Sequence, residues 1–201
     1  PIQAGAIPPA LEGRDVLGIA QTGTGKTASF TLPMITLLGR GRARARMPRS
    51  LVLCPTRELA AQVAENFDTY AKHTRLTKAL LIGGVSMRDQ EQLIDRGVDV
   101  LIATPGRLLD HFERGKLLLT GVQIMVVDEA DRMLDMGLRA TVNSDDPAYF
   151  GGYVNDNYVR TAEAVGLTAG DIVELAKNSF RGSFLEPAEI ERRLHRATGQ
   201  R

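Results

Sequence analysis

The sequence has few of the residues that build metal clusters or disulfide frameworks. It contains one cysteine, three histidines and no tryptophan among 201 residues. The lone Cys54 excludes an internal disulfide and fits a reducing cytoplasm, and so few soft ligands exclude a zinc cluster built from this chain alone. No apolar run approaches the roughly 20 residues of a membrane span, and no signal peptide opens the chain. We expect a cytoplasmic protein and, because the chain begins at Pro1 without an initiator Met, a fragment.

Charge is nearly balanced. The formal net charge of +1 is too small to indicate a nucleic-acid partner by itself. The positive charges are unevenly distributed, because five arginines lie between residues 40 and 49. A basic loop can contact phosphates, but a solvated connector is the commoner use of such a run, and we favour it here.

A glycine-rich stretch from Ala20 to Thr27 predicts a phosphate-binding loop. It matches Gly-x-x-x-x-Gly-Lys-Ser/Thr except at the first position, where Ala20 stands. Gly23 and Gly25 lack a Cβ, so the backbone can turn its N–H groups toward a phosphate. Lys26 is expected to reach the terminal phosphates and the Thr27 hydroxyl to complete a magnesium shell. The expected nucleotide-contacting residues are Ala20, Gln21, Thr22, Gly23, Thr24, Gly25, Lys26 and Thr27.

The flanks of the loop support this interpretation. Residues 15–20 form a short apolar run that predicts a strand, and residues 26–38 have helical spacing. The loop would then lie at a helix N-terminus, where anions are favoured. A chance match in a surface loop is the alternative, and the flanking strand and helix argue against it. Upstream, residues 1–11 predict a short helix interrupted at its prolines.

Apolar segments and helical segments alternate along the chain up to residue 138. Strands are expected at 50–54, 78–82, 99–103 and 123–127, and helices at 57–70, at 86–96 and after Thr104. Continuously apolar strands that alternate with helices are typical of a parallel sheet covered on both faces. Right-handed crossovers place the carboxyl ends of such strands at one edge, so motifs that follow the strands should meet there. Thr56 is expected to cap the helix that follows it.

An acidic cluster follows the last of these strands. Asp128 ends an apolar run, where a carboxylate can hold magnesium opposite a phosphate loop. Glu129 could orient or deprotonate an attacking water. Alone, the cluster could be the acidic first turn of a helix. Because a phosphate loop precedes it by about a hundred residues, the catalytic interpretation is favoured.

These motifs, in this order, resemble the first RecA-like domain of a DEAD-box RNA helicase over residues 1–138. Pro1-Ile2-Gln3 resembles the Q motif, and Ala20 to Thr27 resembles motif I, which commonly begins with Ala in that family. Motif II is matched by Asp128, Glu129, Ala130 and Asp131. Motif Ia, the GG motif and motif Ib are matched by Pro55 to Ala60, by Gly83-Gly84 and by Thr104 to Arg107.

The resemblance implies a RecA-like P-loop NTPase fold and ATP hydrolysis coupled to RNA binding, with ATP and Mg²⁺ as cofactors. By the same resemblance Gln3 reads the adenine edge, Lys26 and Glu129 are catalytic, Asp128 contacts the metal, and Asp131 couples the domains. Phosphates of single-stranded RNA would meet Pro55, Thr56, Arg57, Gly83, Gly84, Thr104, Pro105, Gly106 and Arg107. Contacts of this kind give affinity and salt dependence without reading the bases.

Two parts of the family pattern are not found in the sequence, motif III (Ser-Ala-Thr) and a second RecA-like domain. In the family the second domain supplies an arginine finger, and such a finger is typically worth ~10³ to 10⁵ in rate. We therefore expect nucleotide binding with weak or absent hydrolysis, and no unwinding. The motif III strand lies in the family between the phosphate-loop strand and the strand at 123–127, so its absence predicts a gap in the sheet. Residues 141–143 are hypothesised to fill it.

Residues 139–201 depart from the helicase pattern and resemble the C-terminal end of an adenosine deaminase. The likeness rests on Ser144-Asp-Asp-Pro with the following Tyr-Phe-Gly-Gly-Tyr, and on Leu175 to Phe180. In that family the first Asp is a zinc ligand and the second binds the purine, so Asp145 and Asp146 are vestigial site residues by resemblance. An acidic helix cap is the alternative. A deaminase barrel takes about 250 residues, and its His ligands and catalytic Glu are absent, so no deamination is expected.

The sequence thus predicts an incomplete ATP-binding domain at 1–138 and a mostly helical fragment at 139–201. Tail helices are expected at 155–165, 168–180 and 187–196, the second capped by Thr168. The favoured function is the ATP- and RNA-binding domain of a DEAD-box helicase, with no membrane partner. The alternatives are an inactive deaminase remnant with an unrelated leader, and a nucleotide-dependent interaction module that never turns over.

Overall fold

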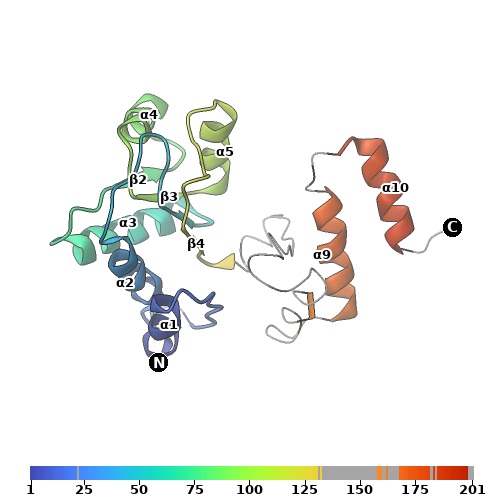
Figure 1. Cartoon of the computed structure of the whole chain (residues 1–201), viewed down its shortest axis with the longest axis horizontal. Helices are drawn as coiled ribbons and strands as arrows, with labels where there is room; N and C mark the ends of the chain where they lie inside the picture. The colour runs from blue at the N-terminus through green and yellow to red at the C-terminus, as the bar shows by residue number, and fades with distance from the viewer. Residues whose placement is uncertain are drawn as a thin grey trace. The chain divides into compact units, whose positions relative to one another are not determined.

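The protein divides into two units, residues 1–132 and residues 133–201. The computed structural model describes residues 1–21, 23–130, 132, 158–159, 162, 168–181, 183 and 185–198. The first unit holds a β-sheet with helices, and the described part of the second unit is helical (Figure 1). No helix in these ranges is both long and apolar enough to cross a membrane.

The sheet of the first unit is parallel and has four strands in the order β2-β3-β1-β4. The strands are β1 (Ser50–Leu53), β2 (Lys78–Leu81), β3 (Val100–Ala103) and β4 (Ile124–Val127). Their register is level, since Leu53 lies opposite both Ala103 and Val127. The carboxyl ends of all four strands therefore meet at one edge, and the predicted parallel α/β fold is confirmed.

Helices cover both faces of this sheet. They are α1 (Ile2–Leu11), α2 (Lys26–Leu38), α3 (Arg57–Ala71), α4 (Met87–Arg96) and α5 (Pro105–Glu113). Figure 1 shows α4 and α5 on the opposite side of the sheet from α2 and α3. On the α2–α3 side, Met34 and Phe67 pack against Val52, Val100 and Ile102, all of them buried. Because the strands are parallel, the loops that follow them all lie at one edge of this three-layered unit.

Helix α1 runs through Pro8 and Pro9 without a break, so the expected interruption at the prolines is wrong. A proline removes one N–H donor from the ladder but leaves its carbonyl free to accept. The carbonyls of Pro8 and Pro9 accept from the N–H groups of Glu12 and Arg14 at 3.1 and 3.0 Å. The helical hydrogen bonding therefore resumes after the prolines.

The expected strand at residues 15–20 does not form. In the described part of the chain β4 pairs with β1 alone, and residues 15–20 make no backbone hydrogen bond. An extended segment becomes a strand only when a neighbour satisfies its N–H and C=O groups. The apolar side chains of Leu17 and Ile19 are 63% and 87% exposed, and Met125 on β4 is 59% exposed. Residues 141–143, proposed to fill a gap here, lie outside the described residues.

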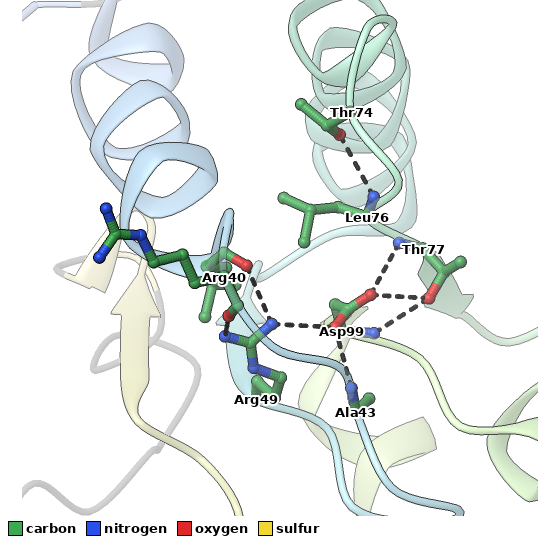
Figure 2. A network of polar contacts seen from close by, with 8 residues as sticks. Arg40, Ala43, Arg49, Thr74, Leu76, Thr77 and Asp99 are labelled. Carbon is green, nitrogen blue, oxygen red and sulfur yellow. Dashed lines mark hydrogen bonds and ion pairs between the residues drawn. The ribbon is translucent and has the colours of Figure 1, made fainter.

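The arginine-rich stretch is more than a solvated connector, because Arg49 is only 9% exposed. Its guanidinium pairs with Asp99 at 3.2 Å and donates to the carbonyls of Leu38 and Arg40 (Figure 2). The Asp99 carboxylate also accepts from the N–H groups of Ala43 and Thr77 and from the Thr77 hydroxyl. This network joins the end of α2 to the starts of β1 and β3, so Arg49 is a structural residue.

The second unit contains α9 (Ala169–Arg181) and α10 (Pro187–Thr198), which contact each other. Thr168 caps α9 as predicted, since its hydroxyl accepts from the N–H of Asp171 at 3.3 Å. The Asp171 carboxylate accepts in return from the N–H of Thr168 at 2.8 Å. Most of the helix predicted at 155–165 lies outside the described residues.

Candidate functional site

The predicted phosphate loop lies at the N-terminus of α2. Gly23 and Gly25 have φ angles of +78° and +87°, which a residue with a Cβ rarely adopts. The Gln3 amide donates to the Gly25 carbonyl at 3.4 Å, so a Cβ at position 25 would also collide with Gln3. Among the described residues, no side chain caps α2. Its first N–H groups are therefore available to an anion.

The acidic cluster lies at the end of β4. The N–H of Asp128 donates to the Leu53 carbonyl at 2.9 Å, which extends the β1–β4 ladder and fixes where the Asp128 side chain begins. Asp128 is only 9% exposed. Burial raises the pKa of its carboxyl, and the positive charge of Lys26 opposes that shift. Lys26 and Asp128 thus line the same cleft, from α2 and from the end of β4.

Glu129 adopts a left-handed backbone conformation, with φ at +50°. A glutamate in this region is uncommon, and such outliers concentrate at functional sites. The Glu129 N–H donates to Oδ1 of Asp128 at 3.1 Å, which holds the first carboxylate in place. The Glu129 carboxylate lies 3.4 Å from Arg132. The two carboxylates are thus oriented by different partners.

Cys54, which follows β1, lies beside this cluster and was not predicted to be near it. Its side chain is fully buried. Burial raises the pKa of the thiol to about 12, and the charges of Asp128 and Glu129 add to that shift. The thiol therefore stays protonated and packs as a small apolar group.

A cleft of about 670 Å³ runs from Ala20 and Lys26, at the two ends of the phosphate loop, to Asp128 and Glu129, whereas Gln3, Gly23, Gly25 and Thr27 do not line it. It is lined by α1, by residues 13–20, by α2 including Lys26, and by residues 123–130 including Asp128 and Glu129. This volume lies within the usual range for ligand pockets, about 300–1,000 Å³. No described residue pairs with the outer edge of β4, and the cleft continues along that strand.

A nucleotide phosphate fits this cleft, since the loop offers N–H groups, the positive end of a helix and Lys26. A metal fits only in company with that phosphate. No group of three or more metal-ligating side chains is present in the described part of the chain. Mg²⁺ is commonly bound by one or two carboxylates together with phosphate oxygens and water. Asp128 and the Thr27 hydroxyl are the protein groups suited to that role.

A second group of predicted residues meets at the same edge of the sheet, beyond β1 and β2. The Arg57 guanidinium lies directly over Gly83 and Gly84, where added Cβ atoms would come within 2.8 and 3.0 Å of it. Gly84 also has a φ of +83°. Thr56 starts α3 as predicted, with its hydroxyl accepting from the Leu59 N–H at 3.3 Å. The backbone at position 84 therefore favours glycine, and a side chain at either position would displace the Arg57 guanidinium.

The predicted residues after β3 form the first turn of α5. Thr104 is its N-cap, Pro105 its first residue, and Gly106 is exposed. The Arg107 side chain lies between α4 and α5, with Nη1 3.4 Å from the Met87 sulfur and Nε 3.8 Å from Asp110. Pro55, by contrast, is buried, so it shapes the turn after β1. The predicted residues Thr22, Asp131, Asp145 and Asp146 lie outside the described residues.

Two buried polar residues beneath this edge were not predicted from the sequence. Gln90 of α4 and His111 of α5 are 2% and 0% exposed, and they hydrogen-bond to each other at 3.0 Å. The sequence held one indication that Gln90 is buried: it lies one helical turn before the buried Ile94, so both residues share a helix face.

The fold is a parallel sheet with a glycine-rich loop at a helix N-terminus, and an Asp-Glu pair ends a strand facing that loop. This combination defines a P-loop nucleotide-binding protein. The family model "DEAD/DEAH box helicase" matches residues 1–145. The chain belongs to this family. A second family model, "Adenosine deaminase", matches residues 119–197, and this part of the chain is similar to that family.

Curated and solved relatives agree with the first assignment. The ATP-dependent RNA helicase SrmB of Escherichia coli is 49% identical over 137 residues, which are 68% of this chain and 31% of that protein. DeaD of Buchnera aphidicola is 50% identical over 138 residues, 68% of this chain and 22% of that protein. The ADP-bound RNA helicase Prp28 of Chaetomium thermophilum is 40% identical with a TM-score of 0.64, over 68% of this chain and 34% of that one. The chain therefore spans about a third or less of these relatives.

Proposed function

We propose that residues 1–138 bind ATP with Mg²⁺ and the backbone of single-stranded RNA. The observation that carries the proposal is the cleft in which the phosphate loop and Lys26 face Asp128 and Glu129. Family membership, the RNA helicase names of the relatives and the ADP-bound state of one of them support it. We take residues 139–201 as a separate fragment.

In this proposal the phosphate loop, the residues of the cleft and Gln3 of α1 each have a separate role. The N–H groups at the start of α2 and the Lys26 ammonium bind the phosphates, and Gln3 binds the adenine edge. Thr27 and Asp128 hold the metal, which neutralises phosphate charge when bound. Glu129 orients or deprotonates the attacking water. Its carboxylate is positioned by the backbone turn at φ +50° and by Arg132.

The RNA contacts come from the loops after β1, β2 and β3. Arg57 and Arg107 supply positive charge, and the Gly83-Gly84 turn and the first turn of α5 supply N–H groups suited to phosphate oxygens. We expect all of these groups to contact the RNA backbone and none to read a base edge. Affinity should therefore fall steeply with salt and vary little with sequence.

Hydrolysis by residues 1–138 alone should be slow, because in the helicase family a second domain delivers the arginine finger. Phosphate release with and without single-stranded RNA tests the catalytic part. RNA-stimulated release that Glu129→Gln abolishes supports a helicase-type ATPase. ATP binding with no release under either condition supports the third interpretation of the sequence, a nucleotide-dependent interaction module.

The deaminase interpretation of residues 139–201 rests on the matching family model alone. Adenosine-to-inosine conversion in the presence of added zinc is its test, and we expect none. The lone buried Cys54 is compatible with the cytoplasmic location that we propose.

A further inference from the structure

Two buried polar side chains connect the loops proposed to bind RNA. Gln90 and His111 come from neighbouring helices, α4 and α5, and the Nε2 atom of His111 lies 3.0 Å from Oε1 of Gln90. The Gln90 amide nitrogen donates to the carbonyl of Ile82 at 3.0 Å. Ile82 is the residue immediately before Gly83-Gly84. A hydrogen-bonded chain therefore runs from α5 through α4 to the glycine turn.

The direction of these hydrogen bonds is fixed by their chemistry. Because the Gln90 nitrogen donates to Ile82, its oxygen is the acceptor, and His111 must carry its proton on Nε2. Nδ1 of His111 is then an acceptor, and it is buried without a partner among the described residues. Burial and the charge of Arg107 lower the pKa of His111, so the ring stays neutral. The pair thus forms one defined arrangement.

An apolar pair would remove the unpartnered Nδ1 but would leave the Ile82 carbonyl without its Gln90 donor, so the polar pair ties α4 and α5 to this carbonyl and does more than fill space. Leaving a buried polar atom unsatisfied costs about 1–3 kcal/mol. A hydrogen-bonded pair, unlike an apolar pair, fixes how its two side chains are oriented relative to each other. His111 lies one helical turn after Arg107 on α5, and Arg107 itself reaches Met87 on α4. The chain of contacts therefore fixes Arg107 relative to the turn over which Arg57 lies.

We propose that Gln90 and His111 are positioning residues for RNA. They hold the Gly83-Gly84 turn and the Arg107-bearing helix in the relative placement that lets Arg57 and Arg107 contact phosphates of one RNA strand. The proposal rests on the proposed function, because it assumes that these two arginines bind the RNA backbone. Neither residue touches the RNA, and neither lines the nucleotide cleft.

The experiment compares the full chain with Gln90→Leu, His111→Leu and the double variant. Gln90→Leu strands the His111 Nε2–H and the Ile82 carbonyl, and His111→Leu strands the Gln90 oxygen, so both should destabilise the fold. In the double variant only the Ile82 carbonyl has lost its donor, so we expect it to be more stable than Gln90→Leu in urea unfolding. Its Kd for a fluorescent single-stranded oligoribonucleotide should nevertheless stay raised by about tenfold, with ATP affinity unchanged within about twofold.

Gln92→Leu is the matched control, because Gln92 is exposed on the same helix, and it should bind RNA as the wild type does. A double variant that binds RNA as tightly as the wild type overturns the proposal. So does a double variant that loses ATP and RNA affinity equally, since that pattern indicates a general loss of structure.

If the wild type binds no RNA, the proposed function fails, and the positioning role is then tested at the backbone alone. Hydrogen exchange at the Thr104 amide, which donates to the Leu81 carbonyl at 3.1 Å just before the turn, should be at least about tenfold faster in the double variant than in the wild type. Unchanged exchange at that amide would overturn the positioning role.

Discussion

Replacing Arg49 by Met should destabilise the first unit by about 3–5 kcal/mol, although Arg49 lies in a stretch whose composition is typical of a solvated basic loop. Met fills much of the same space without the guanidinium. The Asp99 carboxylate, in a residue 6% exposed, would then keep its negative charge without its ionic partner. Removing one member of a buried ion pair leaves an uncompensated charge, which is the costly case.

The remaining contacts set the size of this loss. Asp99 retains three hydrogen bonds, from the Ala43 N–H and from the Thr77 N–H and hydroxyl. They offset part of the lost attraction. The carbonyls of Leu38 and Arg40 lose a donor as well, and each stranded group costs about 1–3 kcal/mol if water cannot reach it. Since a domain has only about 5–15 kcal/mol of net stability, the variant should be close to unfolding.

Urea unfolding followed by circular dichroism measures the difference, with the slope m expected to stay constant. Arg42→Met is the matched control because Arg42 is exposed in the same stretch, and it should change stability by less than about 0.5 kcal/mol. A second check is Arg49→Met combined with Asp99→Asn, which removes the uncompensated charge but keeps an acceptor oxygen for the Ala43 and Thr77 donors and should recover part of the loss. If Arg49→Met costs less than about 1 kcal/mol, the buried network does not stabilise the fold as argued.

Four further outcomes are expected. Gly25→Ala should weaken ATP binding by at least about tenfold in an equilibrium titration, because φ +87° strains any residue with a Cβ and the added Cβ would displace the Gln3 amide; unchanged affinity would contradict the loop geometry. Thr56→Ala should cost about 0.5–2 kcal/mol in urea unfolding through loss of the α3 cap, and no loss would show that the cap is not formed. Cys54 should react with a thiol reagent at pH 8 at least about a hundredfold more slowly in the native chain than in urea, so equal rates would contradict its burial. His111 has a pKa below its ordinary value of 6.5, so on acidification the imidazole is protonated first in the unfolded chain. Stability should therefore fall as pH drops below 6.5 toward the folded pKa. A fall of the same size in the His111→Gln variant would assign the pH dependence to other groups.

Local signals in the sequence were enough to locate most of the elements. The cap at Thr56, the proline at the first position of α5 and the glycines of the phosphate loop each act through neighbours in the chain. Parallel pairing could also be predicted, because strands buried on both faces are apolar throughout. Together these signals are sufficient to predict that Lys26 and Asp128 lie at the same edge of the sheet.

Features that depend on distant partners could not be predicted in the same way. Residues 15–20 have the composition of a strand but make no ladder, because pairing depends on a neighbour that the described residues do not provide. Arg49 resembles the other arginines of its stretch, and only Asp99, fifty residues away, explains its burial. Gln90 and His111 are likewise joined by contacts that no local pattern reveals.

The central claim is that Lys26 and the loop before it bind the phosphates of ATP. Calorimetric titration of the full chain with magnesium-ATP tests it, with Lys72→Ala as the control because Lys72 is exposed at the far end of α3. We predict one saturable site in the wild type and in Lys72→Ala, and binding about 10- to 100-fold weaker in Lys26→Ala, as expected for loss of a charge-assisted contact. A wild-type chain that binds no ATP, or a Lys26→Ala variant that binds it equally well, would contradict the account.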